Sequence, residues 1–318
     1  MLQKNDPEVL AFGVGQPSFR EILTKRQEKT GSALCVGLDP ELKKFPLHIL
    51  NSDMSDEDKV FKWGTEIIDA TSPWASCYKP QSAFYESIEG GKKALRRIVR
   101  YIEANYPDIP PLEDCKRGDI GNTQAQYRIA AFHRDKVGAM NFSPYMGKEC
   151  MSDLFDPAYP GRGIIGLGYT SNPSGRPIQE ALMADGKMLY QFIVEQIFNW
   201  SYEIGVNENG GLVVGAAYDR EKNGRPYTDH LKNCREIVGK KLFFLVPGIG
   251  AQIKGVDQYL FVFATIRDGW AGYGSMIINS SREIIYASDG IDFAEAAAFQ
   301  AKKLNGEIHS ALVEMGWN

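Results

Sequence analysis

The chain has 318 residues, of which 43% are hydrophobic and 24% charged, a composition typical of globular proteins. Its net charge of −4 is spread along the sequence, which argues against a surface built for nucleic acid or an anionic membrane. Because no apolar run approaches the roughly 20 residues that span a bilayer, we expect neither nucleic acid nor membrane as a partner.

The N-terminal segment and the cysteines both indicate a cytoplasmic protein. The first 20 residues carry acidic side chains and no continuous apolar core, unlike a secretory signal. The five cysteines are odd in number and show no Cys-x-x-Cys spacing. We therefore expect reduced thiols, no disulfide framework and no metal site.

Short apolar runs alternate with helical patterns along the chain. The expected strands are residues 32–39, 75–80, 110–116, 137–144, 163–170, 211–217, 241–248 and 275–281. The helical segments between them include residues 55–70, 90–105, 122–133, 178–204 and 291–314. Continuous apolar strands that alternate with helices indicate a parallel sheet covered by helices.

Eight such units predict an α/β fold, a (β/α)8 TIM barrel formed by residues 32–318. A doubly wound open sheet is the alternative. Residues 1–31 form an extension before the first strand, and within it residues 18–29 have a helical pattern. We expect this helix to pack on the floor of the barrel, within a single domain.

Charged residues stand at the ends of the first three expected strands. Asp39 ends the first, Lys79 the second, and Asp114 with Lys116 the third. Active sites of such barrels lie where the strands end, so these side chains are expected to converge. Because side chains alternate along a strand, Asp114 and Lys116 share one face and Cys115 points away. Any one of these residues could belong to a structural ion pair, but the set predicts an active site.

A lysine among carboxylates is suited to one kind of chemistry. Neighbouring carboxylates keep its ammonium protonated. A protonated lysine stabilises an anion or donates a proton to it, whereas Schiff-base chemistry needs the neutral amine. Asp119 follows in a loop between Gly118 and Gly121, which permit sharp turns. The cluster therefore predicts a site that stabilises and protonates a carbanion.

A second group of polar residues follows the last two expected strands, in VPGIGAQ (246–252) and NSSREIIYAS (279–288). Phosphate sites of TIM barrels are typically formed by these two loops. Gly250 permits close backbone approach, Gln252 offers an amide and Arg282 a bidentate guanidinium. The glycine motif alone is as typical of a plain turn, but with Arg282 it predicts phosphate binding.

The segment YTSNPSG (169–175) directly follows the fifth expected strand. Its hydroxyl and amide groups could bind the polar edge of a heterocycle, opposite the charged cluster. A solvated turn would have the same composition.

These motifs together resemble the orotidine 5′-phosphate decarboxylase family, from about residue 18 onwards. The signature Asp-x-Lys-x-x-Asp occupies residues 114–119. The other matching motifs, in the family's order, are LCVGLDP (34–40), KPQSAFYE (79–86), TSNP (170–173), PGIGAQ (247–252) and SR (281–282). The resemblance is to the longer-chain branch. It implies decarboxylation of orotidine 5′-monophosphate to UMP in pyrimidine biosynthesis, without metal or organic cofactor, by a homodimer with shared active sites.

The resemblance also implies catalytic roles. Lys116 would donate a proton to C6 of the pyrimidine, and Asp114 would lie against the substrate carboxylate. Lys79 would pair with the carboxylates and with ribose. Asp119 would reach into the active site of the neighbouring subunit.

The remaining residues implied by the resemblance bind substrate. Asp39 and Gln81 would contact ribose, although many relatives carry asparagine in place of Gln81. Ile120 and Thr123 would join Asp119 in the partner's site. The pyrimidine contacts would be Thr170 and Ser171, and the 5′-phosphate contacts Gly250, Gln252, Ser281 and Arg282. Residues 253–274 would hold a short helix and a loop between the seventh and eighth strands.

Two other functions are compatible with the same motifs. A Mg²⁺-dependent 3-keto-gulonate 6-phosphate decarboxylase shares the Asp-x-Lys-x-x-Asp signature and would lose activity in EDTA. A non-catalytic nucleotide-binding barrel would bind UMP but release no CO2 from orotidine 5′-monophosphate.

Overall fold

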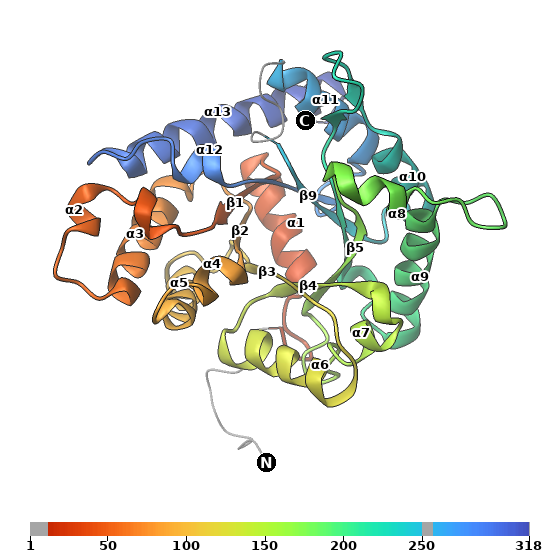
Figure 1. The fold of residues 1–318 in the computed structure, drawn as a ribbon, viewed down its shortest axis with the longest axis horizontal. Coiled ribbons are helices and arrows are strands. Elements are labelled where there is room, and N and C mark those ends of the chain that lie inside the picture. Colours follow the sequence, from red (N-terminus) through yellow and green to blue (C-terminus); the bar gives the residue numbers. More distant parts are fainter. Residues whose placement is uncertain (1–11, 250–256, 318) are drawn as a thin grey trace.

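The computed structural model describes residues 12–249 and 257–317, which form an eight-stranded barrel surrounded by helices (Figure 1). The barrel strands are β1 (Leu34–Leu38), β2 (Cys77–Pro80), β3 (Leu112–Arg117), β4 (Ala139–Phe142), β5 (Gly163–Tyr169), β6 (Gly210–Val214), β9 (Phe243–Pro247) and β10 (Met276–Ser280). They are all parallel, in the order β2-β1-β10-β9-β6-β5-β4-β3.

Two isolated parallel bridges, Tyr78–Pro111 and Gln81–Asp114, bring the first and last strands of this order together. The sheet therefore curls into a barrel rather than remaining open, which confirms the TIM-barrel prediction. Each of the eight strands overlaps an expected range. Strands β1, β2, β4 and β6 are buried along their whole length, since helices cover the outside and side chains fill the inside, whereas β3 becomes more exposed toward its charged end.

A compact apolar cluster fills the inside of the barrel. The strands contribute Cys35, Cys77, Leu112, Ala139, Ile165, Val213, Phe243, Leu245 and Ile277. Helix α1 (Phe19–Thr30) closes the N-terminal end, with Phe19 and Leu23 fully buried in the same cluster. Arg20 donates hydrogen bonds to the carbonyls of Lys241 and Gly274, just before β9 and β10. This helix therefore lies across the floor of the barrel, where Figure 1 shows it inside the ring of strands.

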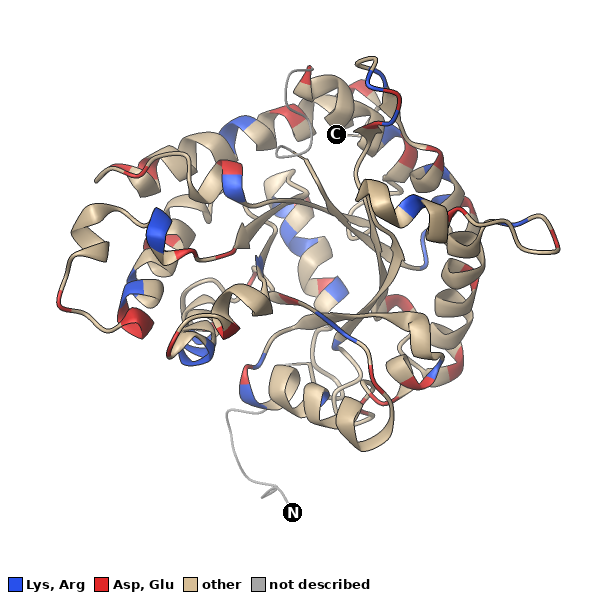
Figure 2. Cartoon of the chain, in the orientation of Figure 1, with Lys and Arg blue, Asp and Glu red and all other residues tan. Residues whose placement is uncertain are grey.

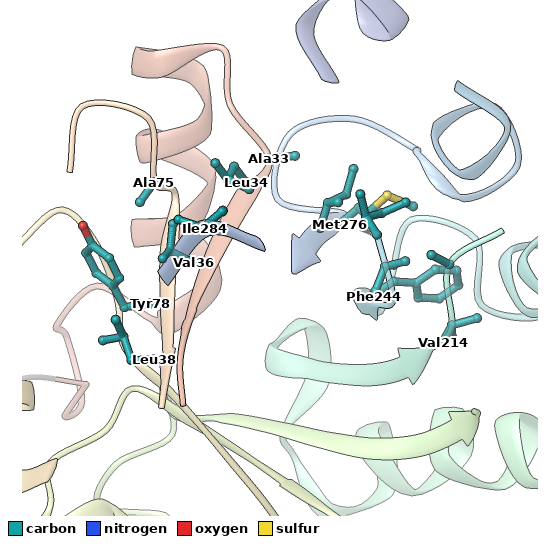
Figure 3. Packing of buried hydrophobic residues seen from close by; sticks show 14 of the residues in the cluster. Ala33, Leu34, Val36, Leu38, Ala75, Tyr78, Val214, Phe244, Met276 and Ile284 are labelled. Carbon is teal, nitrogen blue, oxygen red and sulfur yellow. The ribbon is translucent and has the colours of Figure 1, made fainter. Parts of the chain in front are cut away.

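The larger outer helices are α3 (Asp56–Thr71), α5 (Gly91–Asn105), α6 (Gly121–Arg128), α9 (Leu189–Ile204), α10 (Asp229–Val238), α11 (Gln258–Gly269) and α13 (Phe293–Glu314). Short helices at the rim are α2 (Leu47–Leu50), α4 (Ser82–Glu86), α7 (Glu149–Ser152), α8 (Arg176–Gln179) and α12 (Arg282–Ile285). Their apolar faces pack on outward side chains of the strands, such as Val36, Leu38 and Tyr78 (Figure 3). Among the described residues no helix is long and apolar enough to span a membrane.

Three features differ from the expected elements. The helix expected over 178–204 is divided into α8 and α9, because an Asp-Gly turn with Gly186 at φ +85° interrupts it. Helix α6 continues into a π-helical segment, Ile129–Arg134. A small hairpin of β7 (Tyr218–Asp219) and β8 (Pro226–Tyr227) follows β6. Two-residue strands are too short to show a periodic pattern in the sequence.

Candidate active site

The four charged residues at the ends of β1, β2 and β3 converge at the C-terminal mouth of the barrel. Lys79 Nζ lies 3.7 Å from Asp39 Oδ1 and 3.3 Å from Asp114 Oδ2, and Lys116 Nζ lies 2.5 Å from Asp114 Oδ1. These four residues form a row of alternating charges, Asp39–Lys79–Asp114–Lys116, which we call the charge array. Charged residues otherwise gather on the helices, including the central α1, and on the loops, while the strands are mostly uncharged (Figure 2).

The buried members of the charge array keep each other ionised. Burial would lower the pKa of Lys79, but the carboxylates of Asp39 and Asp114 outweigh it and raise that pKa. Burial would likewise raise the pKa of Asp114, and the ammonium groups of Lys79 and Lys116 hold it well below its usual range. Cys115 lies outside the array, and burial raises its thiol pKa to about 12, so it stays protonated.

The end of β3 is irregular, and Asn141 from β4 supports it. Lys116 has a φ of +48°, and the pairing of β3 with β4 shifts register between Glu113 and Arg117. The side-chain oxygen of Asn141 accepts the backbone N–H groups of Cys115 at 2.8 Å and Lys116 at 2.6 Å. Its nitrogen donates to Asp114 Oδ1 at 2.7 Å. The amide thus replaces the ladder bonds that the irregularity removes.

Asn141 was not among the expected site residues. The sequence does contain a signal for it, since it is the one polar residue in the strand AMNF and is 1% exposed. A buried amide needs hydrogen-bond partners, and here those partners belong to the charge array and its backbone.

Asp119 stands apart from the charge array within this chain. Its Oδ1 accepts the N–H of Ile120 at 2.9 Å, and its own N–H donates to Gln124 Oε1 at 3.2 Å. Ile120 and Thr123 are exposed on the same loop and the first turn of α6. The structure therefore groups Asp119, Ile120 and Thr123 on an exposed loop after β3.

The expected phosphate side begins at a cavity of about 180 Å³, which we call the strand-end cavity. Its lining includes Asp39, Pro247, Gly248, Asn279, Ser281 and Arg282. Because Asp39 belongs to the cavity and to the charge array, the two form one continuous site. Gly37 permits this packing, since a Cβ at Gly37 would lie 1.9 Å from Ser281 Oγ. Gly250 and Gln252 lie outside the described residues, while α11 supplies the helix expected within 253–274.

The loop after β5 is held by its own hydrogen bonds. Gln179 Oε1 accepts the N–H of Thr170 at 2.7 Å, and Gln179 Nε2 donates to Thr170 Oγ1 at 2.9 Å. The hydroxyl of Thr170 donates to Asn172 Oδ1 at 2.7 Å. Ser171, the next residue, rests against the backbone of Gly215. Thr170 therefore shapes this loop, and Ser171 is the less constrained of the two expected pyrimidine contacts.

Gln81 sits between the charge array and α4. Its side-chain oxygen accepts the N–H of Ala83 at 2.6 Å and so caps α4, and its backbone pairs with Asp114. The amide nitrogen remains as the group that could meet the predicted ribose.

Comparisons with known proteins lead to the family that the sequence motifs resemble. The family model "Orotidine 5′-phosphate decarboxylase / HUMPS family" matches residues 32–297. Orotidine 5′-phosphate decarboxylase of Cupriavidus metallidurans is 40% identical over 284 residues, covering 88% of this chain and 93% of the relative. The enzyme of that name from Christiangramia forsetii is 36% identical over 294 residues, covering 92% and 98%.

A solved structure matches as well. The OMP decarboxylase of Leishmania donovani has a TM-score of 0.71 at 30% identity, covering 92% of this chain and 98% of that one. The family-model match over residues 32–297 spans the charge array and the strand-end cavity. The chain belongs to the orotidine 5′-phosphate decarboxylase / HUMPS family.

Proposed function

We propose that the chain decarboxylates orotidine 5′-monophosphate to UMP in pyrimidine biosynthesis. The observation that carries the proposal is the charge array, with its alternating Asp39, Lys79, Asp114 and Lys116, joined through Asp39 to the strand-end cavity. The names of the relatives support the same reaction.

Loss of CO2 from C6 of the substrate leaves a vinyl carbanion that no adjacent carbonyl delocalises. Its stabilisation must therefore come from a preplaced cation. Lys116 fits this role because its side chain is 45% exposed toward solvent while Asp114 holds its ammonium at 2.5 Å. Once CO2 has left, the ammonium donates its proton to C6, and UMP forms.

Asp114 contributes before the bond breaks. Two ammonium groups keep it ionised, so it would face the substrate carboxylate as a second negative charge. The resulting repulsion is relieved when CO2 leaves. Binding of the distant phosphate supplies the free energy that forces the two carboxylates together. In this scheme the phosphate is bound beside the strand-end cavity by Ser281, Arg282, Gly250 and Gln252. The ribose is bound by Asp39, Lys79 and Gln81. The pyrimidine is contacted by Thr170 and Ser171.

A homodimer with shared sites completes the proposal. The loops after β3 and β4 lie together, since Ser143 N donates to the carbonyl of Arg117 at 2.7 Å. They expose Ile120 (45%), Tyr145 (92%) and Met146 (49%), apolar side chains that a second subunit would cover. In a dimer that buries this surface, Asp119 and Thr123 would lie close to the charge array of the partner subunit.

We also place the protein in the cytoplasm. The five cysteines are free thiols and four of them are buried, which fits a reducing compartment. The reaction as written uses only groups of the chain itself, without a metal or organic cofactor.

The test is the ultraviolet absorbance of orotidine 5′-monophosphate mixed with purified protein in buffer that contains EDTA. We expect a steady change toward the UMP spectrum. Lys116→Ala should abolish this change but retain UMP binding, while Lys43→Ala, at a lysine 81% exposed outside the site, should behave as wild type. No turnover despite UMP binding would indicate a non-catalytic barrel. Turnover that EDTA abolishes and Mg²⁺ restores would indicate a metal-dependent decarboxylase.

A further inference from the structure

A buried imidazole lies below the loop that follows β5. His230, at the start of α10, is 1% exposed and is enclosed by tyrosine rings. Its ring stacks on Tyr169 at a centroid distance of 4.5 Å and on Tyr227 at 5.8 Å, and lies 5.4 Å from Tyr218. The proposed chemistry uses none of these four rings.

One hydrogen bond defines the state of the imidazole. His230 Nε2 lies 2.8 Å from the carbonyl oxygen of Gly215. A carbonyl only accepts, so Nε2 carries a proton. Nδ1 is buried and has no hydrogen-bond partner among the described residues. Burial lowers the pKa of His230 to about 4, so the ring is neutral near pH 7.

Gly215 is the residue on which Ser171 rests. A Cβ at Gly215 would lie 2.9 Å from Ser171 Cβ and 3.1 Å from Ser171 N, too close for any side chain without displacing the Ser171 backbone. Gly215 N donates to the carbonyl of Tyr169 at 2.9 Å, next to the same loop. The position of Gly215 therefore limits how closely Ser171 can approach the end of the barrel.

The other side of the loop is anchored separately. Glu180 accepts two hydrogen bonds from Arg220, at 3.0 and 2.7 Å, and one from Tyr169 Oη at 2.8 Å. Thr170 is fixed by Gln179, as described above. With these residues held, a movement of Gly215 acts mainly on Ser171.

We propose that His230 is a positioning residue for recognition of the pyrimidine: by holding the carbonyl of Gly215 it sets the height of Ser171 above the barrel. The inference rests on the proposed function, in which Ser171 meets the base. It assigns His230 no contact with substrate. Its effect should therefore be confined to ligands that carry the base.

The experiment compares binding of UMP with binding of ribose 5-phosphate, which has the same phosphate and sugar but no pyrimidine. His230→Phe keeps a stacked ring and removes the donor. Gly215→Ala keeps the donor and displaces Ser171. Both should weaken UMP binding about tenfold and leave the dissociation constant of ribose 5-phosphate within about twofold. In His230→Gln the amide nitrogen can reach the carbonyl of Gly215, so this variant should bind UMP with an affinity close to that of wild type.

Gly306→Ala is the matched control, because a Cβ there meets nothing within 4 Å, and both affinities should be unchanged. Equal weakening of both ligands, or unchanged UMP binding in the two variants, overturns the inference. If His230→Phe does not fold by circular dichroism, His230→Leu, which also lacks the donor, takes its place and should show the same selective loss of UMP binding. Wild-type protein that binds UMP and consumes orotidine 5′-monophosphate upholds the proposed function whatever the variants do. Wild-type protein that binds neither ligand ends both proposals.

Discussion

The side-chain oxygen of Asn141 accepts the backbone N–H of Lys116 at 2.6 Å, and this bond holds Lys116 at a φ of +48°. A residue other than glycine rarely adopts that conformation, which costs about 1–3 kcal/mol unless the surroundings impose it. Asn141 also donates to Asp114 Oδ1 at 2.7 Å. One buried amide thus fixes both the proposed proton donor and the carboxylate beside it.

We expect Asn141→Ala to lower kcat by about 10- to 100-fold, because Lys116 would lose its fixed backbone and C6 would no longer meet a preplaced ammonium. UMP affinity should change by less than about threefold, since the effect falls on reaction geometry rather than on binding. Steady-state kinetics and calorimetry with UMP measure the two quantities. Asn105→Ala, at an exposed position of α5, is the control. An unchanged kcat would show that the ion pair with Asp114 alone places Lys116.

Arg282→Ala tests the phosphate end. Arg282 is exposed at the start of α12, beside the strand-end cavity. Loss of its charge-assisted hydrogen bonds should weaken UMP binding by about 2 kcal/mol and leave binding of uridine, which lacks the phosphate, unchanged. Titration of both ligands against the variant measures this difference. Arg100→Ala, on the exposed face of α5, should change neither affinity. An equal loss for uridine would contradict a phosphate role for Arg282.

Mixed subunits test whether the active site is shared. Lys116→Ala and Asp119→Ala should each inactivate a homodimer. A heterodimer would combine the intact Lys116 of one subunit with the intact Asp119 of the other in one of its two sites. We therefore expect a mixture of the two inactive variants to recover about a quarter of wild-type activity after random exchange, since half the dimers would carry one intact site.

Size-exclusion chromatography of differently tagged subunits would establish that exchange took place. No recovery after complete exchange would mean that Asp119 acts within its own chain. That result would require the exposed loop after β3 to fold back over the charge array.

The strands and the charge array could be predicted because both follow from local rules. Apolar runs identify strands, and parallel strands in a barrel end at one face, so Asp39, Lys79 and Asp114 had to meet there. The irregularity at Lys116 could not be predicted, because it depends on a hydrogen bond from another strand. The same holds for His230. A lone histidine at the start of a helix is ordinary in sequence, and only the fold places it against the carbonyl of Gly215.

His230 also predicts a pH dependence of stability. In the folded chain burial lowers its pKa to about 4, below the ordinary value of 6.5. Between these values the unfolded chain binds a proton that the folded chain does not, so stability falls as pH falls. The contribution is complete above pH 6.5, and about 3 kcal/mol of it should be lost on approaching pH 4.

Urea unfolding of wild type and His230→Gln between pH 7 and pH 4 measures this contribution. Because glutamine does not titrate, the difference between the two free energies of unfolding should change by about 3 kcal/mol over this interval, with wild type losing more. Protonation of carboxylates such as Asp114 affects both proteins alike and cancels in the difference. Gly306→Ala, where a Cβ meets nothing within 4 Å, should retain the wild-type pH dependence. Parallel curves for wild type and His230→Gln would mean that the folded chain binds the His230 proton as readily as the unfolded chain, so that burial does not lower the pKa of this ring.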